Sequence, residues 1–191
     1  MTYALLHQHC QSLSPYIKRC VIYDRILALT GINRIVHVRM GLDTSSCRGL
    51  YLSARNTDHQ LVKQLGGHVI VTARGLSKVM DRFIFIKELM HVFDDPKEAT
   101  DNGDAFEELL GEFTKPQKAN LSPQMESEID CYWMATSVLC PDAARLQFKQ
   151  QFAHDPDCLP KIAKEAGIPG SYMPSLFEQH YETTVAAILA K

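Results

Sequence analysis

The first third of the chain changes from a helical to a strand-like hydrophobic pattern. Over residues 3–30, apolar side chains recur at spacings of three and four, which predicts helix, and Gly31 supplies a stop. Three short runs of alternating, β-rich residues follow at 35–40, 49–54 and 68–73, each bounded by glycine or polar residues. These runs predict a small sheet with antiparallel or mixed pairing.

The remaining chain is predicted to be mainly helical. A helix is expected over 77–95, because Ser77 is a good N-cap and Pro96 follows the last turn. A second helix is expected over 124–140, since Ser122-Pro123 places a capping residue before a proline in the first turn. Further helical segments are predicted at 105–113, 142–152 and 160–190.

These elements predict a single α+β domain over residues 1–191. It comprises an N-terminal helical segment over 1–30, a core over 32–141 and a helical C-terminal extension over 142–191. The chain contains no internal repeat or low-complexity linker that requires a second domain.

Composition and charge exclude several classes of protein. Hydrophobic residues make up 46% and charged residues 22%, which is typical of a globular protein and argues against disorder. A net charge of −2 lacks the basic character of proteins that bind nucleic acids or anionic membranes. No apolar run reaches the roughly 18–20 residues that span a bilayer, and the first residues lack signal-peptide features. With six dispersed cysteines and no CxxC, we expect a reduced, cytoplasmic protein.

The helix predicted over 83–95 separates apolar from polar side chains. Its apolar residues occupy a broad arc, while Lys87, Glu88, His91 and Asp95 share the remaining arc. A solvent-exposed stripe and an inward-facing polar site both fit this pattern. The helical-wheel projection of this segment alone leaves the two interpretations open.

The later helix favours the inward-facing interpretation. Glu128 begins an apolar stripe that continues through Tyr132, Ala135 and Leu139 at helical spacing. A carboxylate that faces a core is unfavourable unless it is paired, hydrogen-bonded or bound to a cation. We therefore expect polar groups from the two helices to form one site.

These residues resemble a known family. The segment 87–91, Lys-Glu-Leu-Met-His, is similar to the HExxH motif of zincin metallopeptidases with its first histidine replaced. A preceding strand, the Arg82-Phe83 pair, and the later Glu128 and Pro141 resemble the ImmA/IrrE-type domain, found in bacterial and phage-like settings. The resemblance implies a zincin-like fold. It extends over about 48–141 and is specific over 82–95 and 128–141.

The resemblance implies roles for individual residues. In an intact family member, two histidines and a carboxylate bind zinc, and the glutamate beside the first histidine acts as general base. Carried onto this chain, His91 and Glu128 hold ligand positions, Glu88 holds the general-base position, and Lys87 replaces the first ligand. Asp95 is expected on the same side of the helix, at the pocket.

Lys87 is expected to leave this zinc site incomplete. An ammonium group has no lone pair and is repelled by a dication, and a neutral amine requires a strongly lowered pKa. His59 and His68 are candidate replacement ligands whose positions the sequence does not fix. We therefore expect no cofactor, because the Lys87 ammonium takes the place of the zinc ion. Zinc is expected only if the site is functional.

The implied function is regulatory. Intact members of the family are linked to repressor cleavage and to stress or mobile-element regulation. A degenerate member would be a protein-binding pseudo-metallopeptidase whose partner is a protein or peptide, such as a transcriptional regulator. An extended peptide could pair with the edge of the strand 68–73. The alternative is an active metal-dependent peptidase with altered ligation that cleaves a regulatory protein.

Binding to nucleic acid is disfavoured. Residues 162–179 superficially resemble a helix-turn-helix, but Pro169 and Pro174 fall in or near the would-be recognition helix. A proline inside a helix is destabilising by about 3 kcal/mol. A segment of helical core is the better interpretation.

Overall fold

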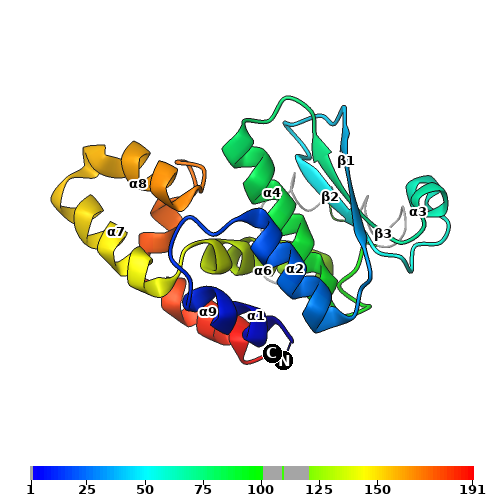
Figure 1. The fold of residues 1–191 in the computed structure, drawn as a ribbon, viewed down its shortest axis with the longest axis horizontal. Helices are drawn as coiled ribbons and strands as arrows, with labels where there is room; N and C mark the ends of the chain where they lie inside the picture. The colour runs from blue at the N-terminus through cyan, green and yellow to red at the C-terminus, as the bar shows by residue number, and fades with distance from the viewer. Residues whose placement is uncertain (1, 101–108, 110–120) are drawn as a thin grey trace.

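The computed structural model describes residues 2–100, 109 and 121–191. Within these residues the fold is α+β, as predicted, with a small sheet and a largely helical remainder (Figure 1). Except for Leu109, the helix predicted over 105–113 lies outside the described residues. Across the described part of the chain, no helix is long and apolar enough to cross a bilayer.

Two helices, rather than one, precede the sheet. Helix α1 spans Thr2–Gln11 and α2 spans Arg19–Thr30, so the continuous helix predicted over 3–30 is wrong. Pro15 lies in the interruption, and proline disfavours helical backbone in the residue before it. Gly31 ends α2 as predicted, with a left-handed φ of 70°.

The sheet contains the three predicted strands in mixed pairing. Strand β1 spans Ile35–Met40, β2 spans Gly49–Leu52 and β3 spans His68–Ala73, in the order β1-β3-β2. Strand β1 runs parallel to β3, with Ile35 opposite His68, whereas β2 runs antiparallel to β3.

This order corrects the expected peptide-binding edge. Strand β3 (68–73) is paired on both sides, so it cannot offer an edge to a peptide. Among the described residues, the outer strands of the sheet are β1 and β2.

Two helices cover opposite faces of the sheet (Figure 1). The short helix α3, Gln60–Leu65, lies on the face where Val69 and Val71 form a small apolar cluster. The longer helix α4, Lys78–Met90, lies on the other face, where Ile70 joins the main core. Because successive side chains of β3 point to opposite faces of the sheet, each face presents apolar residues against which one helix packs.

Helix α4 begins where the sequence predicts but ends earlier. The Ser77 hydroxyl accepts a hydrogen bond from the backbone N–H of Met80, which caps the helix. The helix predicted over 77–95 becomes a 3₁₀ turn at His91–Phe93, and Asp94 then adopts extended backbone at ψ 140°. The directions of side chains beyond residue 93 therefore no longer follow the periodicity of an α-helix.

The C-terminal half is a series of helices, as predicted. Helix α6 spans Pro123–Leu139, and the Ser122 hydroxyl caps it by accepting from the Met125 N–H. The segment predicted as helical over 160–190 is divided into separate pieces. The remaining elements are α7 (Asp142–His154), a 3₁₀ turn at Pro156–Cys158, α8 (Leu159–Ala166), a 3₁₀ turn at Pro174–Phe177, and α9 (Tyr181–Leu189).

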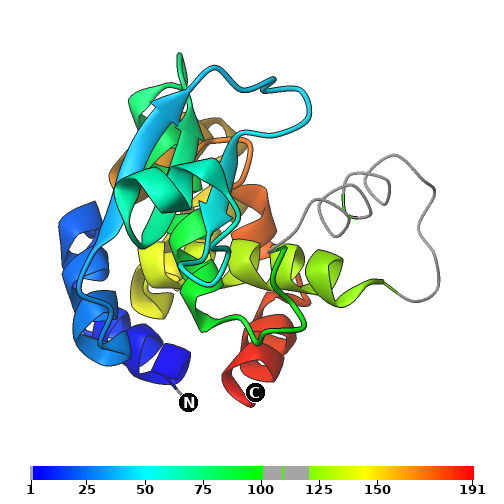
Figure 2. The same ribbon diagram turned by 90° about the vertical axis from the view of Figure 1, so that its right-hand side faces the viewer.

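Helix α4 is sandwiched between the sheet and α6. It contacts β2 and β3 on one side and α6 on the other, while α1 and α9 both pack on α6. Figure 2 shows α6 running beneath the sheet. The arrangement sets the two helices predicted to carry polar groups against each other.

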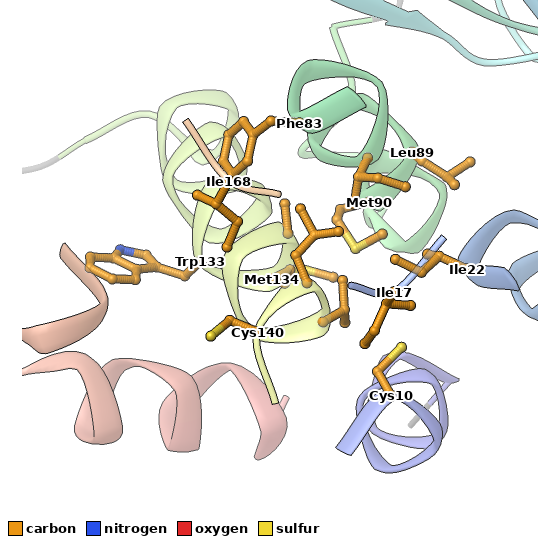
Figure 3. Close-up of a cluster of buried hydrophobic side chains, with 14 of the residues drawn as sticks. Cys10, Ile17, Ile22, Phe83, Leu89, Met90, Trp133, Met134, Cys140 and Ile168 are labelled. Carbon is orange, nitrogen blue, oxygen red and sulfur yellow. The ribbon is translucent and has the colours of Figure 1, made fainter. Parts of the chain in front are cut away.

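The main core joins residues from the N-terminal helices, one face of the sheet, α4, α6 and the C-terminal helices. Figure 3 shows side chains from α4, α6 and the N-terminal segment converging, among them Met90, Met134 and Ile17. Arg82 is buried in this region, where its guanidinium donates to the carbonyls of Ile17 and Gly167. This arginine therefore ties α4 to both the N-terminal and the C-terminal segments.

Candidate functional site

A cavity of about 390 Å³ lies between the sheet and the two central helices. Residues 44–51, which include the first three residues of β2, form one wall, and α4 and α6 contribute the opposite wall with Tyr172. The polar arc of α4 lines this cavity instead of facing bulk solvent. The side chains are only 14% exposed for Lys87, 3% for Glu88 and 10% for His91.

Lys87 forms the centre of an ion-pair cluster. Its Nζ donates to Glu128 of α6 and lies 3.1 Å from Glu88 Oε1. Burial alone would lower the pKa of Lys87, but the charges of Glu88 and Glu128 raise it above its ordinary value. Lys87 is therefore an ammonium group that bridges two carboxylates.

The two carboxylates differ in their electrostatic environment. Burial raises the pKa of Glu88, and the nearby Lys87 charge only partly opposes this. Glu128 is also buried, but Lys87 and His91 together hold its pKa well below the usual range. Glu128 therefore stays ionised, whereas Glu88 takes up a proton more readily.

Gly49 of β2 allows the sheet to approach Glu88 closely. A Cβ atom at this position would lie 2.4 Å from Ile84 Cγ2 and 2.8 Å from Glu88 Cγ. These distances are shorter than van der Waals contact, so a side chain there would force α4 away. A glycine at this point fixes one wall of the cavity against the carboxylate.

His91 contacts acidic groups through both ring nitrogens. Its Nε2 lies 3.3 Å from Glu128 Oε1, and its Nδ1 lies 2.8 Å from Asp94 Oδ2. Burial alone would lower the pKa of His91, but the neighbouring Cys131, Glu128 and Asp94 raise it well above its ordinary value. The imidazole therefore holds a proton more tightly than an exposed histidine does.

A second set of polar atoms surrounds His91 Nδ1. His91, Asp94 and Cys131 each place one potential metal-ligating atom within 4.8 Å of the others. The Cys131 thiol lies 3.9 Å from Asp94 Oδ1, and its burial raises its pKa to about 11. The Ser127 hydroxyl lies 3.3 Å from His91 Nδ1. The structure therefore contains a possible His/Asp/Cys metal-binding triad.

Asp94 and Cys131 are not among the residues that the sequence predicts for the site. Cys131 is one of the six dispersed cysteines expected only to be reduced, although it lies three positions after Glu128 and thus on a neighbouring face of the same helix. Asp94 follows His91 by three residues, which is also a contact spacing in a helical turn. These two spacings were the available signals.

The structure brings four of the five predicted site residues together and excludes the fifth. Lys87, Glu88, His91 and Glu128 share the cavity, whereas Asp95 lies at another cavity, of about 480 Å³. The prediction for Asp95 is wrong because α4 ends at Met90, so the helical phase does not continue to residue 95.

The two upstream histidines have other contacts. His68 Nδ1 lies 2.6 Å from the Tyr51 hydroxyl, and the Tyr51 ring stacks between His68 and His91. His59 caps α3 by accepting from the Leu61 N–H. Within the described part of the chain, neither histidine lines the cavity, so neither replaces the first ligand.

The residues around Lys87 do not fit a zincin-type zinc ion. Such a site requires three ligands with free lone pairs and an open fourth position. His91 and Glu128 supply two ligand groups, but the third position holds an ammonium that already donates to Glu128. A dication there would be adjacent to this positive charge, so the donor set is unsuitable.

Comparisons with known proteins do not assign the chain to a family. No family model matches it, and no curated protein matches it. The resemblance to the ImmA/IrrE-type domain therefore stays a prediction, and the function has to be argued from the geometry of the cavity.

Proposed function

We propose that this protein is a degenerate zincin-like domain of the ImmA/IrrE type that acts by binding a protein or peptide. The observation that carries the proposal is the Lys87 ammonium between Glu88 and Glu128. It supplies inside the cavity the positive charge that a metal would otherwise supply. The domain thus keeps the architecture of a peptidase cleft without the zinc of the catalytic position.

The cavity supports recognition of an extended segment. It lies beside β2, an outer strand of the described sheet, and an added peptide strand could form main-chain hydrogen bonds there. Tyr51, Tyr132 and Tyr172 add aromatic surface to the cavity. A peptide from a regulatory protein, such as a transcriptional regulator, is the partner that this arrangement suits.

Metal analysis tests the proposal directly. The protein is purified without a metal-affinity column, and its zinc content is measured beside that of the Glu128→Gln and Cys131→Ser variants. We expect the Glu128→Gln variant to contain as much zinc as the unaltered chain, because no zinc is bound at the zincin position. Near-stoichiometric zinc that is lost in Glu128→Gln but kept in Cys131→Ser would overturn the proposal.

Restoring the missing ligand is the complementary test. Lys87→His should raise zinc affinity by at least about 10-fold, since even an outer partner of a zinc ligand is worth about 10- to 100-fold. Isothermal titration with zinc chloride measures the change, and Lys161→His on the exposed surface of α8 is the matched control. Equal affinities for the two variants would contradict the proposed ligand geometry.

An active peptidase with altered ligation is the second candidate. One observation favours it: burial raises the pKa of Glu88, and a carboxylate with a raised pKa suits general acid–base work. Cleavage of peptide bonds that is lost in Glu88→Gln and inhibited by a chelator would select this function. Binding of peptide without cleavage selects the first.

A further inference from the structure

We propose that His91, Asp94 and Cys131 form a binding site for a zinc-like divalent transition metal. This site is separate from the zincin position and does not rest on the proposed function. It uses Nδ1 of His91, whereas the zincin position lies on the Nε2 side, next to Glu128. Its ligands come from the end of α4, the following turn and α6.

The distances between the ligand atoms suit tetrahedral coordination. Zinc binds nitrogen and oxygen at about 2.0–2.2 Å and sulfur at about 2.3 Å, so adjacent ligand atoms lie about 3.3–3.6 Å apart. Here the distance is 2.8 Å from His91 Nδ1 to Asp94 Oδ2 and 3.9 Å from Asp94 Oδ1 to Cys131 Sγ. All three ligand atoms lie within 4.8 Å of one another, so a bound ion would draw the sulfur closer and move the nitrogen and oxygen slightly apart.

A fourth ligand has space beside the triad. The Ser127 hydroxyl lies 3.3 Å from His91 Nδ1 and 3.9 Å from Cys131 Sγ, on the same side of α6. Either this hydroxyl or a water molecule completes a tetrahedron. The set of thiolate, imidazole and carboxylate selects zinc or cobalt over calcium and magnesium, which prefer oxygen ligands.

An ion can reach the triad from the second cavity. Asp94 borders both cavities, and Ser127 lines the second one, which opens between α1, α9 and the turn after α4. The bound ion would hold that turn against α6. It displaces the proton of His91 Nδ1 and the thiol proton of Cys131, and both protons go to solvent.

The site leaves the Lys87 cluster intact. Lys87 continues to bridge Glu88 and Glu128, because none of these three side chains is a ligand of the triad. Metal at the triad and metal at the zincin position would both use His91, but through different ring nitrogens. Cys131 is a ligand only of the first and Glu128 only of the second.

Cobalt titration tests the site in the full chain. The protein is stripped of metal with a chelator, desalted and titrated with Co²⁺, and the near-ultraviolet band of thiolate-to-cobalt charge transfer is recorded. We expect one Co²⁺ per chain with this band and its displacement by Zn²⁺. Absence of cobalt binding, or binding without the thiolate band, would overturn the proposal.

Variants assign the ligands. Cys131→Ser should abolish the band, and Asp94→Asn should lower cobalt affinity by at least about 10-fold. Cys20→Ser, at an exposed cysteine of α2 that lines neither cavity, should leave both unchanged. Circular dichroism checks that each variant is folded. Asp94→Asn, which keeps the size of the side chain, provides the second variant should Cys131→Ser unfold.

Glu128→Gln separates this proposal from the proposed function. If the triad binds the ion, the thiolate band survives in Glu128→Gln, although loss of the carboxylate beside His91 Nε2 lowers the cobalt affinity by about 10- to 100-fold. The band is lost in Cys131→Ser. The reverse pattern refutes both proposals at once, because it places the ion at the zincin position. If the unaltered chain binds no cobalt, the metal site at the triad is refuted, but the proposed function is not.

Discussion

Removing the charge of Lys87 should destabilise the protein, because two carboxylates inside the cavity would lose their cation. The side chains of Glu88 and Glu128 are only 3% and 21% exposed. Truncating one member of a buried ion pair is destabilising by about 3–5 kcal/mol. Burial raises the pKa of Glu88, so this carboxylate can take up a proton and limit the loss. We therefore expect about 3 kcal/mol for Lys87→Met at pH 7.

The loss corresponds to a measurable thermal shift. A chain of this size loses about 2–4 °C in Tm per kcal/mol, so Lys87→Met should melt about 6–12 °C lower. The exposed Lys161→Met on α8 is the matched control and should change the free energy of unfolding by less than about 0.5 kcal/mol. Urea unfolding followed by circular dichroism measures both.

A double-mutant cycle isolates the interaction itself. Glu128→Gln removes the partner charge, so the double variant Lys87→Met/Glu128→Gln leaves fewer unpaired charges than Lys87→Met alone. The double variant should therefore lose less free energy of unfolding than the two single variants lose together, by about 1–3 kcal/mol. Strictly additive losses, or a Lys87→Met variant as stable as Lys161→Met, would refute the bridging role of Lys87.

Two further predictions concern the walls of the site and the sheet. Gly49→Ala should lower the free energy of unfolding by about 1–3 kcal/mol, because its Cβ would lie 2.4 Å from a methyl of Ile84. Gly41→Ala, which has no atom within 4 Å of its Cβ among the described residues, is its control, and equal urea midpoints would refute the close packing. Partial burial alone would raise the pKa of Asp81, but hydrogen bonds from Arg39 and Thr72 hold it below its usual value. The stability that Asp81 contributes is thus present above about pH 4 and lost as the pH falls through the lower folded-state pKa. Asp81→Asn should therefore be less stable than the unaltered chain at pH 7, on the order of 1 kcal/mol given solvent screening of the exposed Arg39, and the difference should shrink as the pH falls through the folded-state pKa of Asp81. A stability difference in urea unfolding that stays constant below about pH 4 would show that the effect is not electrostatic.

The sequence predicts elements well where the local pattern decides them. All three strands follow from alternation, and the caps at Ser77 and Ser122 mark the starts of α4 and α6. The order β1-β3-β2 does not follow, because it depends on pairing between strands that are distant in sequence. For this reason β3 was expected to have an open edge, although it is the central strand.

The errors in the helices arise where apolar spacing extends past the end of an element. Apolar residues continue at helical spacing through 12–18, yet Pro15 lies within the break between α1 and α2. Similarly, Pro96 predicts a helix that continues to residue 95, but α4 ends at Met90. A helix of that length places Asp95 on the side of Lys87, whereas the change of backbone after Phe93 brings Asp94 to His91.

His91 connects the two halves of the site through its two ring nitrogens. Its Nε2 lies 3.3 Å from Glu128 Oε1, and its Nδ1 lies 2.8 Å from Asp94 Oδ2, with Cys131 beside them. A metal ion binds only a deprotonated imidazole nitrogen and a thiolate, so an ion that enters the triad would release any proton held on these ligand atoms to solvent. The Asp94 carboxylate and the Cys131 thiolate would then offset the two positive charges of the ion inside the protein. Lys87 could remain an ammonium, because it pairs with Glu88 and Glu128 and not with the triad.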